Sequence, residues 1–509
     1  MPGGEACAAA RRVPRLLLVA WVLLLAAWAV GNPPFAAPDE TDHYIRAVGI
    51  SEGHLIGVAD PSARVGATER QIRWTAQAAR LVAIPAGFDP TQYGCELGPG
   101  QRSAACQNAA DPRPAPTTLV TTVGNYQPFP YLLPAALLRA GDSPASALRL
   151  ARLGVAAMAF ALLAVALFAL YDAQAPLTSL LGLVLVVTPM VLFCGASLNG
   201  SATEIAGGVA FFACLLRVAR PAPPRWRWWA LTALSGATLA LSRSVSPLWL
   251  VLALAIAAAW GGVRPFVRRV GREWGGRAAA VALLAAVAVN RVWEALYGSR
   301  TLVDLHQLHA GLVAGVHEWW TALPDLVGKF GYLDIKLPLV VPIAWLALVG
   351  ALIAVAAAAC ARRERILLAV VVAAALAGPV VFYAVFLRPI DFGLQGRHVL
   401  PILVSVPLLA GEALHRHRDR IASRALAGFA AVAIAAVAVM QPVAWYVNAR
   451  IYAVGGAGPA WFLSAPAWSP PGGWWPWLIA ALLGGAAMAA IAASALPDLR
   501  RGRAAALAP

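Results

Sequence analysis

The chain has 509 residues, of which 60% are hydrophobic and only 13% charged, and its mean hydropathy is +0.69. These values exclude a water-soluble globular protein, a disordered chain and a fibrous repeat. The formal net charge of +16 does not indicate nucleic-acid binding, because the basic residues lie in short segments between long apolar stretches. The composition is that of a membrane protein, and we expect membrane lipids and no nucleic acid among its partners.

Long apolar stretches recur along the chain, each near the roughly 20 residues that a helix needs to cross a bilayer. About twelve can be distinguished, so the sequence predicts an all-α polytopic membrane protein with about twelve transmembrane helices. The predicted spans are residues 14–31, 146–171, 177–197, 201–218, 227–242, 244–260, 277–297, 338–360, 365–388, 397–414, 423–447 and 475–496. The segment from Tyr126 to Arg139 is too short to span and contains prolines, so we expect an interfacial or re-entrant helix there.

The distribution of charge indicates which loops face the cytoplasm. With the N-terminus inside, as Arg11, Arg12 and Arg15 suggest, the predicted inner segments hold 22 of the 40 basic and 7 of the 24 acidic residues. The outer segments hold 18 basic and 17 acidic residues, so nearly all of the net charge lies inside, as the positive-inside rule requires. We interpret the first apolar stretch as a retained anchor, and a cleaved signal peptide is the alternative.

This topology divides the chain into five parts. Residues 1–31 form a cytoplasmic tail and the first span, and residues 32–145 form a large extracytoplasmic loop with interfacial helices. Residues 146–297 hold spans two to seven, residues 298–337 a second extracytoplasmic loop, and residues 338–509 the remaining spans and a cytoplasmic tail. Cys95 and Cys106 lie in the first outer loop, where an oxidising compartment would allow them to form a disulfide.

Polar residues collect directly after the first span, between Asn32 and Ala47. Prolines open this segment, and Asp39 can cap a helix that follows them. His43 comes four residues after Asp39 and Arg46 three after His43, so a helix would place all three on one face. That face would present a carboxylate, an imidazole and a guanidinium above the bundle. The alternative is an N-cap followed by a solvated helix face.

The same segment offers a possible metal site. Asp39, Glu40, Asp42 and His43 fall within five consecutive positions, and carboxylate oxygens are ligands that Mg²⁺ and Mn²⁺ prefer. The sequence alone leaves open whether a divalent cation binds there.

A second cluster lies at the outer mouth of the tenth span, from Phe392 to Pro401. It contains Gln395, Arg397 and His398, with glycines that allow the backbone to approach a ligand closely. An arginine at the hydrocarbon boundary suits a phosphate or pyrophosphate held at the membrane surface. The alternative is an interfacial arginine that anchors the helix end.

Other unusual polar groups fall at the same end of the bundle. Asn199 lies in a tight outer turn and Glu204 one turn into the next helix, while Arg243 marks another short outer turn. Glu294 approaches the outer end of the seventh span, and Asp334 precedes the eighth. Polar groups near the hydrocarbon usually face a protein interior or an aqueous cavity, so their convergence on one end indicates a site there.

In these motifs the chain resembles the DUF2142 family of polytopic bacterial membrane proteins, which is placed with the GT-C superfamily of glycosyltransferases. The matching pieces are spread over most of the chain and keep their order. They are Pro33-Pro34 through Pro38-Asp39-Glu40 with His43 and Arg46-Ala47, Tyr126 to Tyr131 ahead of Leu132-Leu133-Pro134, Asn199, Tyr332-Leu333-Asp334, and Gln395-Gly396-Arg397 with Pro401. Two positions depart from the family pattern, which favours a tyrosine at His398 and a His-Pro-Pro-like string at Gln127-Pro128-Phe129.

The resemblance implies a GT-C-like fold in the bacterial plasma membrane and transfer of a sugar on the extracytoplasmic face. The donor would be a polyprenyl-phosphate-linked sugar and the acceptor a cell-envelope glycan or lipid. We expect an inverting reaction in which Asp39, or otherwise Glu40, takes the proton of the acceptor hydroxyl. Arg397, with His398 or Arg243, would stabilise the departing phosphate.

The remaining predicted substrate-binding residues share a position at the outer end of the bundle: His43, Arg46, Tyr126, Gln127, Asn199, Asp334 and Gln395. The alternative function is a carrier or flippase for a lipid-linked saccharide. A carrier would favour ionisable residues near mid-bilayer and discontinuous helices. The middles of the predicted spans are almost free of charge, which favours the transferase.

Overall fold

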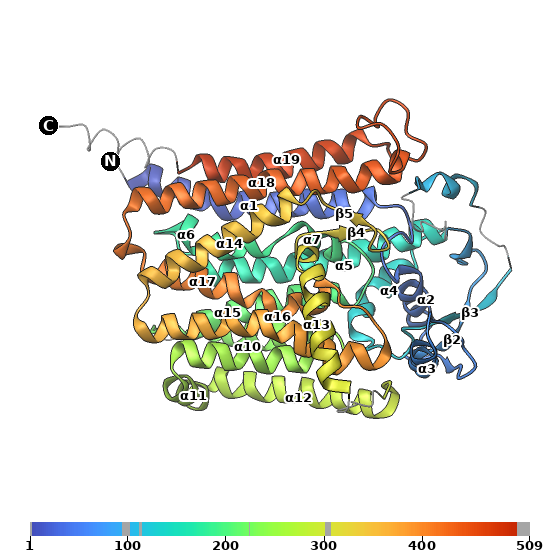
Figure 1. Ribbon diagram of the computed structural model, residues 1–509, viewed down its shortest axis with the longest axis horizontal. Coiled ribbons are helices and arrows are strands. Elements are labelled where there is room, and N and C mark those ends of the chain that lie inside the picture. Colours follow the sequence, from blue (N-terminus) through green and yellow to red (C-terminus); the bar gives the residue numbers. More distant parts are fainter. Residues whose placement is uncertain (1–2, 94–101, 111–114, 223, 301–306, 496–509) are drawn as a thin grey trace.

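The computed structural model describes residues 3–93, 102–110, 115–222, 224–300 and 307–495, and these are mostly helical (Figure 1). Long helices run side by side along the longest axis of the molecule. The helices are α1 (Gly3–Gly31), α2 (Glu40–Ser51), α3 (Glu69–Ala78), α4 (Leu132–Leu138), α5 (Pro144–Leu170), α6 (Pro176–Val186), α7 (Pro189–Gly195), α8 (Ser201–Val218), α9 (Trp226–Ala240), α10 (Ser246–Gly261), α11 (Val263–Arg272), α12 (Trp274–Tyr297), α13 (Leu308–Ala322), α14 (Val340–Ala359), α15 (Arg362–Phe382), α16 (Gly396–Leu403), α17 (Ser405–Arg416), α18 (Ser423–Val454) and α19 (Trp475–Ala493).

The predicted polytopic architecture is confirmed. Within the described residues, nine helices are long and apolar enough to cross a membrane, and two bent pairs, α6 with α7 and α10 with α11, bring the number to as many as eleven. The predicted span at residues 227–242 forms α9, whose 15 residues are fewer than a straight crossing of the hydrocarbon core requires. The sequence therefore locates the apolar helices well but overstates the number of full spans.

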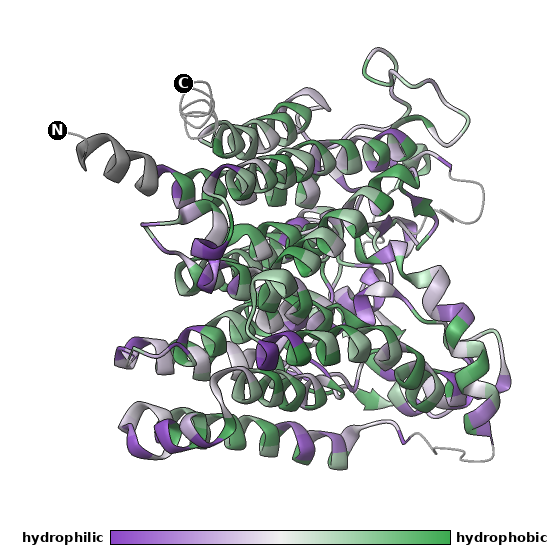
Figure 2. Ribbon diagram, turned by 60° about the vertical axis from the view of Figure 1, so that its left-hand side comes forward, coloured by the Kyte–Doolittle hydropathy of each residue, from purple (hydrophilic) through white to green (hydrophobic). Residues whose placement is uncertain are grey.

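The two ends of the bundle differ in what they carry. The start of α1, the end of α19 and α11 lie at one end, and α2, α3, α4 and strands β2 and β3 lie at the other (Figure 1). Hydrophobic residues run along the long helices, whereas hydrophilic residues gather toward their ends (Figure 2). Helix α11 turns by 107° from α10 and carries Arg264, Arg268, Arg269 and Arg272. The basic loops predicted to be cytoplasmic thus lie opposite the large segment 32–145.

The third predicted span is broken rather than continuous. Helices α6 and α7 meet at 68°, directly before Pro189, which cannot continue the hydrogen-bond ladder. The side chain of Gln441 donates to the Val187 carbonyl at 2.7 Å, and the Thr188 hydroxyl donates to the Leu326 carbonyl at 2.8 Å. Protein groups therefore satisfy the polar atoms that the break frees, and the break is part of the packed core.

The segment 32–145 contains a small antiparallel sheet that the sequence reading did not anticipate. Strands β1 (Val58–Ala59), β2 (Arg80–Ile84) and β3 (Thr117–Thr121) lie in the order β1-β2-β3, and Arg80 pairs with Thr121. The β-branched run of β3 favours an extended strand, but its five residues are too few to stand out in an apolar chain. The end of β3 leads directly into the turn 122–127. A two-stranded hairpin, β4 (Lys329–Phe330) and β5 (Ile335–Lys336), follows α13.

The short segment after this turn forms a 3-10 turn (Phe129–Tyr131) followed by α4. Phe129, Leu132, Leu133 and Leu137 are exposed, whereas Leu138 on the opposite face is buried. An apolar exposed face on so short a helix is typical of a segment at a membrane interface. The interfacial assignment stays a prediction, because the exposed face alone does not locate the bilayer.

Candidate functional site

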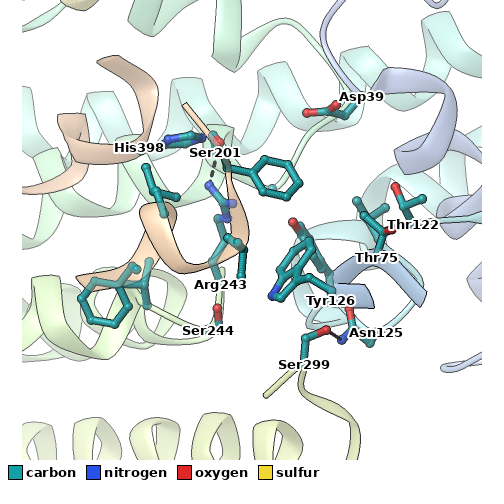
Figure 3. A pocket seen from close by; sticks show the side chains of 18 of the residues that line it. Asp39, Thr75, Thr122, Asn125, Tyr126, Ser201, Arg243, Ser244, Ser299 and His398 are labelled. Carbon is teal, nitrogen blue, oxygen red and sulfur yellow. Dashed lines mark hydrogen bonds between the residues drawn. The ribbon is translucent and has the colours of Figure 1, made fainter. Parts of the chain in front are cut away.

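A cavity of about 280 Å³ lies at the end of the bundle that carries α2 and α3. Eight of the twelve predicted site residues line it: Asp39, His43, Tyr126, Gln127, Arg243, Gln395, Arg397 and His398. They come from the start of α2, the turn after β3, the turn between α9 and α10, and the start of α16. In Figure 3, Arg243, Ser201 and His398 lie on one side of the cavity, and Asn125, Tyr126 and Ser299 lie on the other.

Asp39 occupies the N-cap position of α2 in a left-handed backbone conformation, with φ of 61°. The sequence predicts that the Asp39 side chain caps this helix, but it forms no capping hydrogen bond. It turns instead to accept a hydrogen bond from Arg397 Nη2 at 2.8 Å, across 358 positions of sequence. The left-handed conformation is uncommon outside glycine, although Asp adopts it more readily than most residues. Such strained residues are often found at functional sites.

The charge state of Asp39 follows from its surroundings. Its side chain is 57% exposed because it projects into the cavity, but protein groups surround it closely. Burial alone raises the pKa of this carboxyl, and the Arg397 guanidinium, with His43 and Arg243, outweighs burial and lowers it below the ordinary value of 3.8. Asp39 is therefore a carboxylate that faces two arginines.

His43 lies one turn into α2 and also faces the cavity. Its Nδ1 is 2.6 Å from the hydroxyl of Tyr131, and the two rings stack with their centroids 5.8 Å apart. Burial lowers the pKa of His43 to about 3, with Asp39 opposing the shift and Arg397 adding to it. The imidazole is consequently neutral at physiological pH. Burial also raises the pKa of Tyr131, so its hydroxyl keeps its proton.

Arg243 provides the second cation of the cavity. Its Nη1 lies 3.7 Å from a carboxylate oxygen of buried Glu204 and donates to the Ser201 hydroxyl at 3.4 Å. Its guanidinium lies 5.8 Å from the centre of the Tyr126 ring, within the range of a cation–π contact. Burial lowers the pKa of Arg243, but Glu204 and Tyr126 outweigh it and the net shift is upward. The hydroxyl of Ser246 donates to the other oxygen of Glu204 at 2.7 Å.

Arg397 is positioned by its own helix start. Its Nε donates to the Gln395 side chain at 2.6 Å, and the Gln395 backbone N–H donates to His398 Nδ1 at 3.4 Å. The contact between Gln395 and His398 belongs to a reciprocal cap at the first turn of α16. Gln395 also holds the Arg397 side chain directly, and both Gln395 and His398 line the cavity.

The turn after β3 forms the opposite wall. The side chain of Gln127 donates to a carboxylate oxygen of Glu294 at 3.3 Å and lies 3.4 Å from the Asn290 carbonyl. Behind the turn, Arg46 Nη2 donates to the Tyr126 carbonyl at 2.8 Å. Arg46 is itself buried and does not line the cavity, so it supports the wall rather than facing a ligand.

Glu40 lies next to Asp39 in sequence but points away from the cavity. Its carboxylate binds Arg152 of α5 through two hydrogen bonds of 2.8 and 2.5 Å, and both side chains are 0% exposed. The Leu198 N–H also donates to Glu40 at 3.0 Å. Arg152 donates in addition to the carbonyls of residues 29, 32 and 33. This placement leaves Glu40 no route to a reacting hydroxyl.

Two other predicted residues also lie outside the cavity. Asn199 bonds within its own tight turn, where its side chain donates to the carbonyls of Cys194 and Ser197 and accepts from the Ala202 N–H. Asp334 lies in the turn between β4 and β5, where backbone N–H groups of the turn bond to its carboxylate. Both therefore fix local backbone geometry rather than face the cavity.

The residues considered for a divalent cation do not converge. Asp39 binds Arg397, Glu40 binds Arg152, Asp42 accepts from the Thr122 N–H at 2.6 Å, and His43 contacts Tyr131. In the described part of the chain, the one group of three side chains with metal-ligand spacing is Cys360, Glu364 and His417, between other helices. These four side chains therefore do not fit such a cation, and no step is derived through one.

The structure describes one of the two cysteines of the predicted disulfide. Cys106 is disulfide-bonded, and its predicted partner Cys95 lies outside the described residues. Cys194, Cys214 and Cys360 are free and buried.

Several cavity residues were not identified from the sequence. Trp74 and Thr75 of α3 reach the cavity. Glu294, which the sequence marks as a polar group at the end of a span but not as a site residue, lines it from the end of α12. Phe382 and Phe386 add an apolar portion. The two phenylalanines are spaced i,i+4 at the end of an apolar helix, a pattern that equally suits a lipid-facing position. Glu294 could have been found from the sequence, because an acidic residue at the end of a predicted span usually has a charged partner or faces an aqueous cavity.

The ion pair predicts a defined pH dependence. In the wild type the pKa of Asp39 is lower in the folded state than the ordinary value of 3.8. The carboxylate therefore stabilises the fold fully above pH 3.8, and this stabilisation is lost as the pH falls through the folded-state pKa. Replacing Arg397 by Gln leaves burial as the main influence and is expected to raise this pKa. The stability difference between wild type and Arg397→Gln should then shrink as the pH falls from about 7 toward 4. Chemical unfolding in detergent at several pH values measures it, and a difference independent of pH would contradict the assignment.

One comparison with known proteins, the family match, agrees with the sequence motifs. The model of the family described as "Predicted membrane protein (DUF2142)" matches residues 22–406. No curated protein matches the chain. Among solved structures, the chain is similar to ArnT from Cupriavidus metallidurans in the apo state, with 14% sequence identity and a TM-score of 0.34. That match covers 73% of this chain and 67% of the other.

Proposed function

The chain belongs to the DUF2142 family of membrane proteins, and we propose that it is a glycosyltransferase that moves a sugar from a polyprenyl-phosphate-linked donor to a cell-envelope glycan or lipid. The observation that carries the proposal is the pairing of Asp39 with Arg397 in a cavity that also holds Arg243. A carboxylate can take a proton from a hydroxyl, and arginines bind phosphate strongly. The cavity thus combines the two functions that such a transfer needs.

In the proposed reaction, Asp39 accepts the proton of the acceptor hydroxyl as the hydroxyl oxygen attacks the anomeric carbon. The bond between this carbon and the phosphate oxygen breaks on the opposite face, which inverts the anomeric configuration. The electron pair leaves with the polyprenyl phosphate, and Arg397 and Arg243 stabilise the charge that grows there. Neutral His43 supplies a hydrogen-bonding group without adding charge, and His398 lines the same cavity.

The ion pair between Asp39 and Arg397 also bears on the strength of the base. A carboxylate with a depressed pKa is a weak proton acceptor, and catalysis favours a pKa nearer the working pH. Donor phosphate would compete with Asp39 for the Arg397 guanidinium. Once this cation turns to the phosphate, burial again dominates and the pKa of Asp39 rises. Donor binding would in this way activate the base.

A lipid-linked donor suits the position of the cavity. Phe382, Phe386 and Phe392 line it beside the polar groups, and Phe386 is 40% exposed at the surface of the bundle. An isoprenoid tail could pass over this apolar portion into the bilayer while the phosphate reaches the arginines. The basic loops lie at the other end of the bundle, which supports an extracytoplasmic cavity in a bacterial plasma membrane.

Reconstitution tests the proposal directly. Purified protein in lipid vesicles is expected to incorporate labelled sugar from a polyprenyl-phosphate donor into added acceptor, with release of polyprenyl phosphate in equal amount. The readout is a new glycosidic bond, identified by mass spectrometry. Movement of intact lipid-linked sugar across the vesicle without such a bond would instead identify a carrier or flippase and overturn the proposal.

A further inference from the structure

The two walls of the cavity differ in hydrogen-bonding character. One wall carries the guanidinium groups of Arg243 and Arg397, which only donate. The other wall consists of the turn after β3 and the end of α12, with Asn125, Gln127 and Glu294 (Figure 3 labels Asn125). These three side chains carry no formal positive charge.

The amide donors of the second wall are already engaged by protein. Asn125 Nδ2 donates to the Tyr297 carbonyl and the Ser299 hydroxyl, both at 3.1 Å, and Gln127 Nε2 donates to Glu294. Their amide oxygens are buried and have no partner among the described residues. A buried acceptor without a donor is unfavourable, so a group that meets this wall gains by donating.

Glu294 extends the same character into the cavity. It is partly exposed, and none of the ion pairs in the described chain includes it, although the charge of Arg291 on the same helix acts on it from a distance. The neighbouring Arg291 turns elsewhere, to the Asn290 side chain and the Ser244 carbonyl. Gln127 donates one hydrogen bond to the Glu294 carboxylate, and the carboxylate can accept further hydrogen bonds from a ligand.

We propose that Glu294, with Asn125 and Gln127, binds the hydroxyl groups of the transferred sugar and that this sugar carries no carboxylate. The inference rests on the proposed function and narrows its substrate class. The arginine wall receives the phosphate, and the acceptor wall receives hydroxyl donors one sugar away. A carboxylate on the sugar, where it faces this wall, would be repelled by the Glu294 carboxylate and could not donate to the amide oxygens. A lipid-linked sugar with such a carboxylate therefore binds poorly.

A matched pair of ligands tests the wall without relying on transfer. Polyprenyl monophosphates carrying glucose, galactose or arabinose are compared with the same lipid carrying glucuronic acid. At equal concentration, at least one uncharged sugar lipid is expected to raise the Tm of the wild-type protein more than the glucuronyl lipid does. Equal or greater stabilisation by the glucuronyl lipid overturns the inference, as does the absence of stabilisation by every uncharged sugar lipid.

Glu294→Gln assigns the effect to this side chain. The variant keeps the size of the residue but removes its charge, and it is expected to bind the preferred uncharged sugar lipid about tenfold more weakly. Its discrimination against the glucuronyl lipid should also fall. Glu69→Gln, at an exposed position of α3, is the matched control and should behave as wild type. Unchanged selectivity in Glu294→Gln overturns the role of Glu294.

Loss of this inference and loss of the proposed function give different results. Selective binding without any transfer would count against the transferase and leave the acceptor wall in place. Transfer that uses uncharged and glucuronyl donors equally would overturn the wall alone.

Discussion

Replacing Asp39 by Asn is expected to lower the rate of sugar transfer by roughly 100- to 10,000-fold, the usual contribution of a positioned general base. The amide of Asn cannot accept the proton of the acceptor hydroxyl at this pH. Because the lost interaction acts in the reaction rather than in donor binding, kcat should fall much more than KM rises. The rate of glycosidic bond formation in vesicles, at saturating donor, measures the effect.

Asn is also the least disruptive replacement for the backbone at this position. Asp39 has φ of 61°, and Asn adopts this left-handed conformation more readily than most residues. Its side-chain oxygen can still accept from Arg397, so α2 keeps its start. Asp142→Asn, at an exposed carboxylate ahead of α5, serves as the matched control and should retain full activity. A stable Asp39→Asn protein that transfers sugar at the wild-type rate would remove Asp39 from the mechanism.

The convergence of Asp39 and Arg397 follows from topology that the sequence already contains. Asp39 follows the first predicted span by eight residues and Arg397 opens the tenth, and the parity of the spans places both at the same end of the bundle. The regular period of apolar residues and the asymmetry of the basic loops define this end without any knowledge of side-chain contacts. The order of the spans and most of the charged residues that line the cavity could therefore be predicted, whereas most of its other lining residues could not.

The divergence of Asp39 and Glu40 could not be predicted in the same way. It depends on one left-handed residue, which turns the Asp39 side chain toward α16 and leaves Glu40 to begin α2 facing α5. Nothing in the local sequence specifies that conformation. The partner of Glu40, Arg152, lies inside a predicted span, where an arginine usually pairs with an acidic residue. The sequence does not identify that acidic residue. The acceptor wall is predicted only in part. The sequence predicts that Gln127 binds substrate and marks Glu294 as an unusual acid, but Asn125 is missed, because the amides become unusual only once protein groups engage their donors.

Glu40→Gln is expected to destabilise the protein by about 3–5 kcal/mol, the typical cost of removing one partner of a buried ion pair. Glutamine leaves the Arg152 guanidinium without a counter-charge at a site where both side chains are fully buried. The Leu198 N–H can still donate to the amide oxygen, so the loss arises mainly from the uncompensated cation. Chemical unfolding in detergent micelles measures the free energy of unfolding.

The same variant separates the two neighbouring carboxylates. Folded Glu40→Gln protein should transfer sugar within about threefold of the wild-type rate, because Glu40 does not reach the cavity. A change in rate of about threefold corresponds to less than about 1 kcal/mol in activation free energy. The Asp39→Asn protein, in contrast, should fold normally and fail to transfer. Arg152→Gln should reproduce the loss of stability, since it removes the same pair and also the donors to three backbone carbonyls. If Glu40→Gln were as stable as wild type but inactive, the roles of the two residues would have to be exchanged.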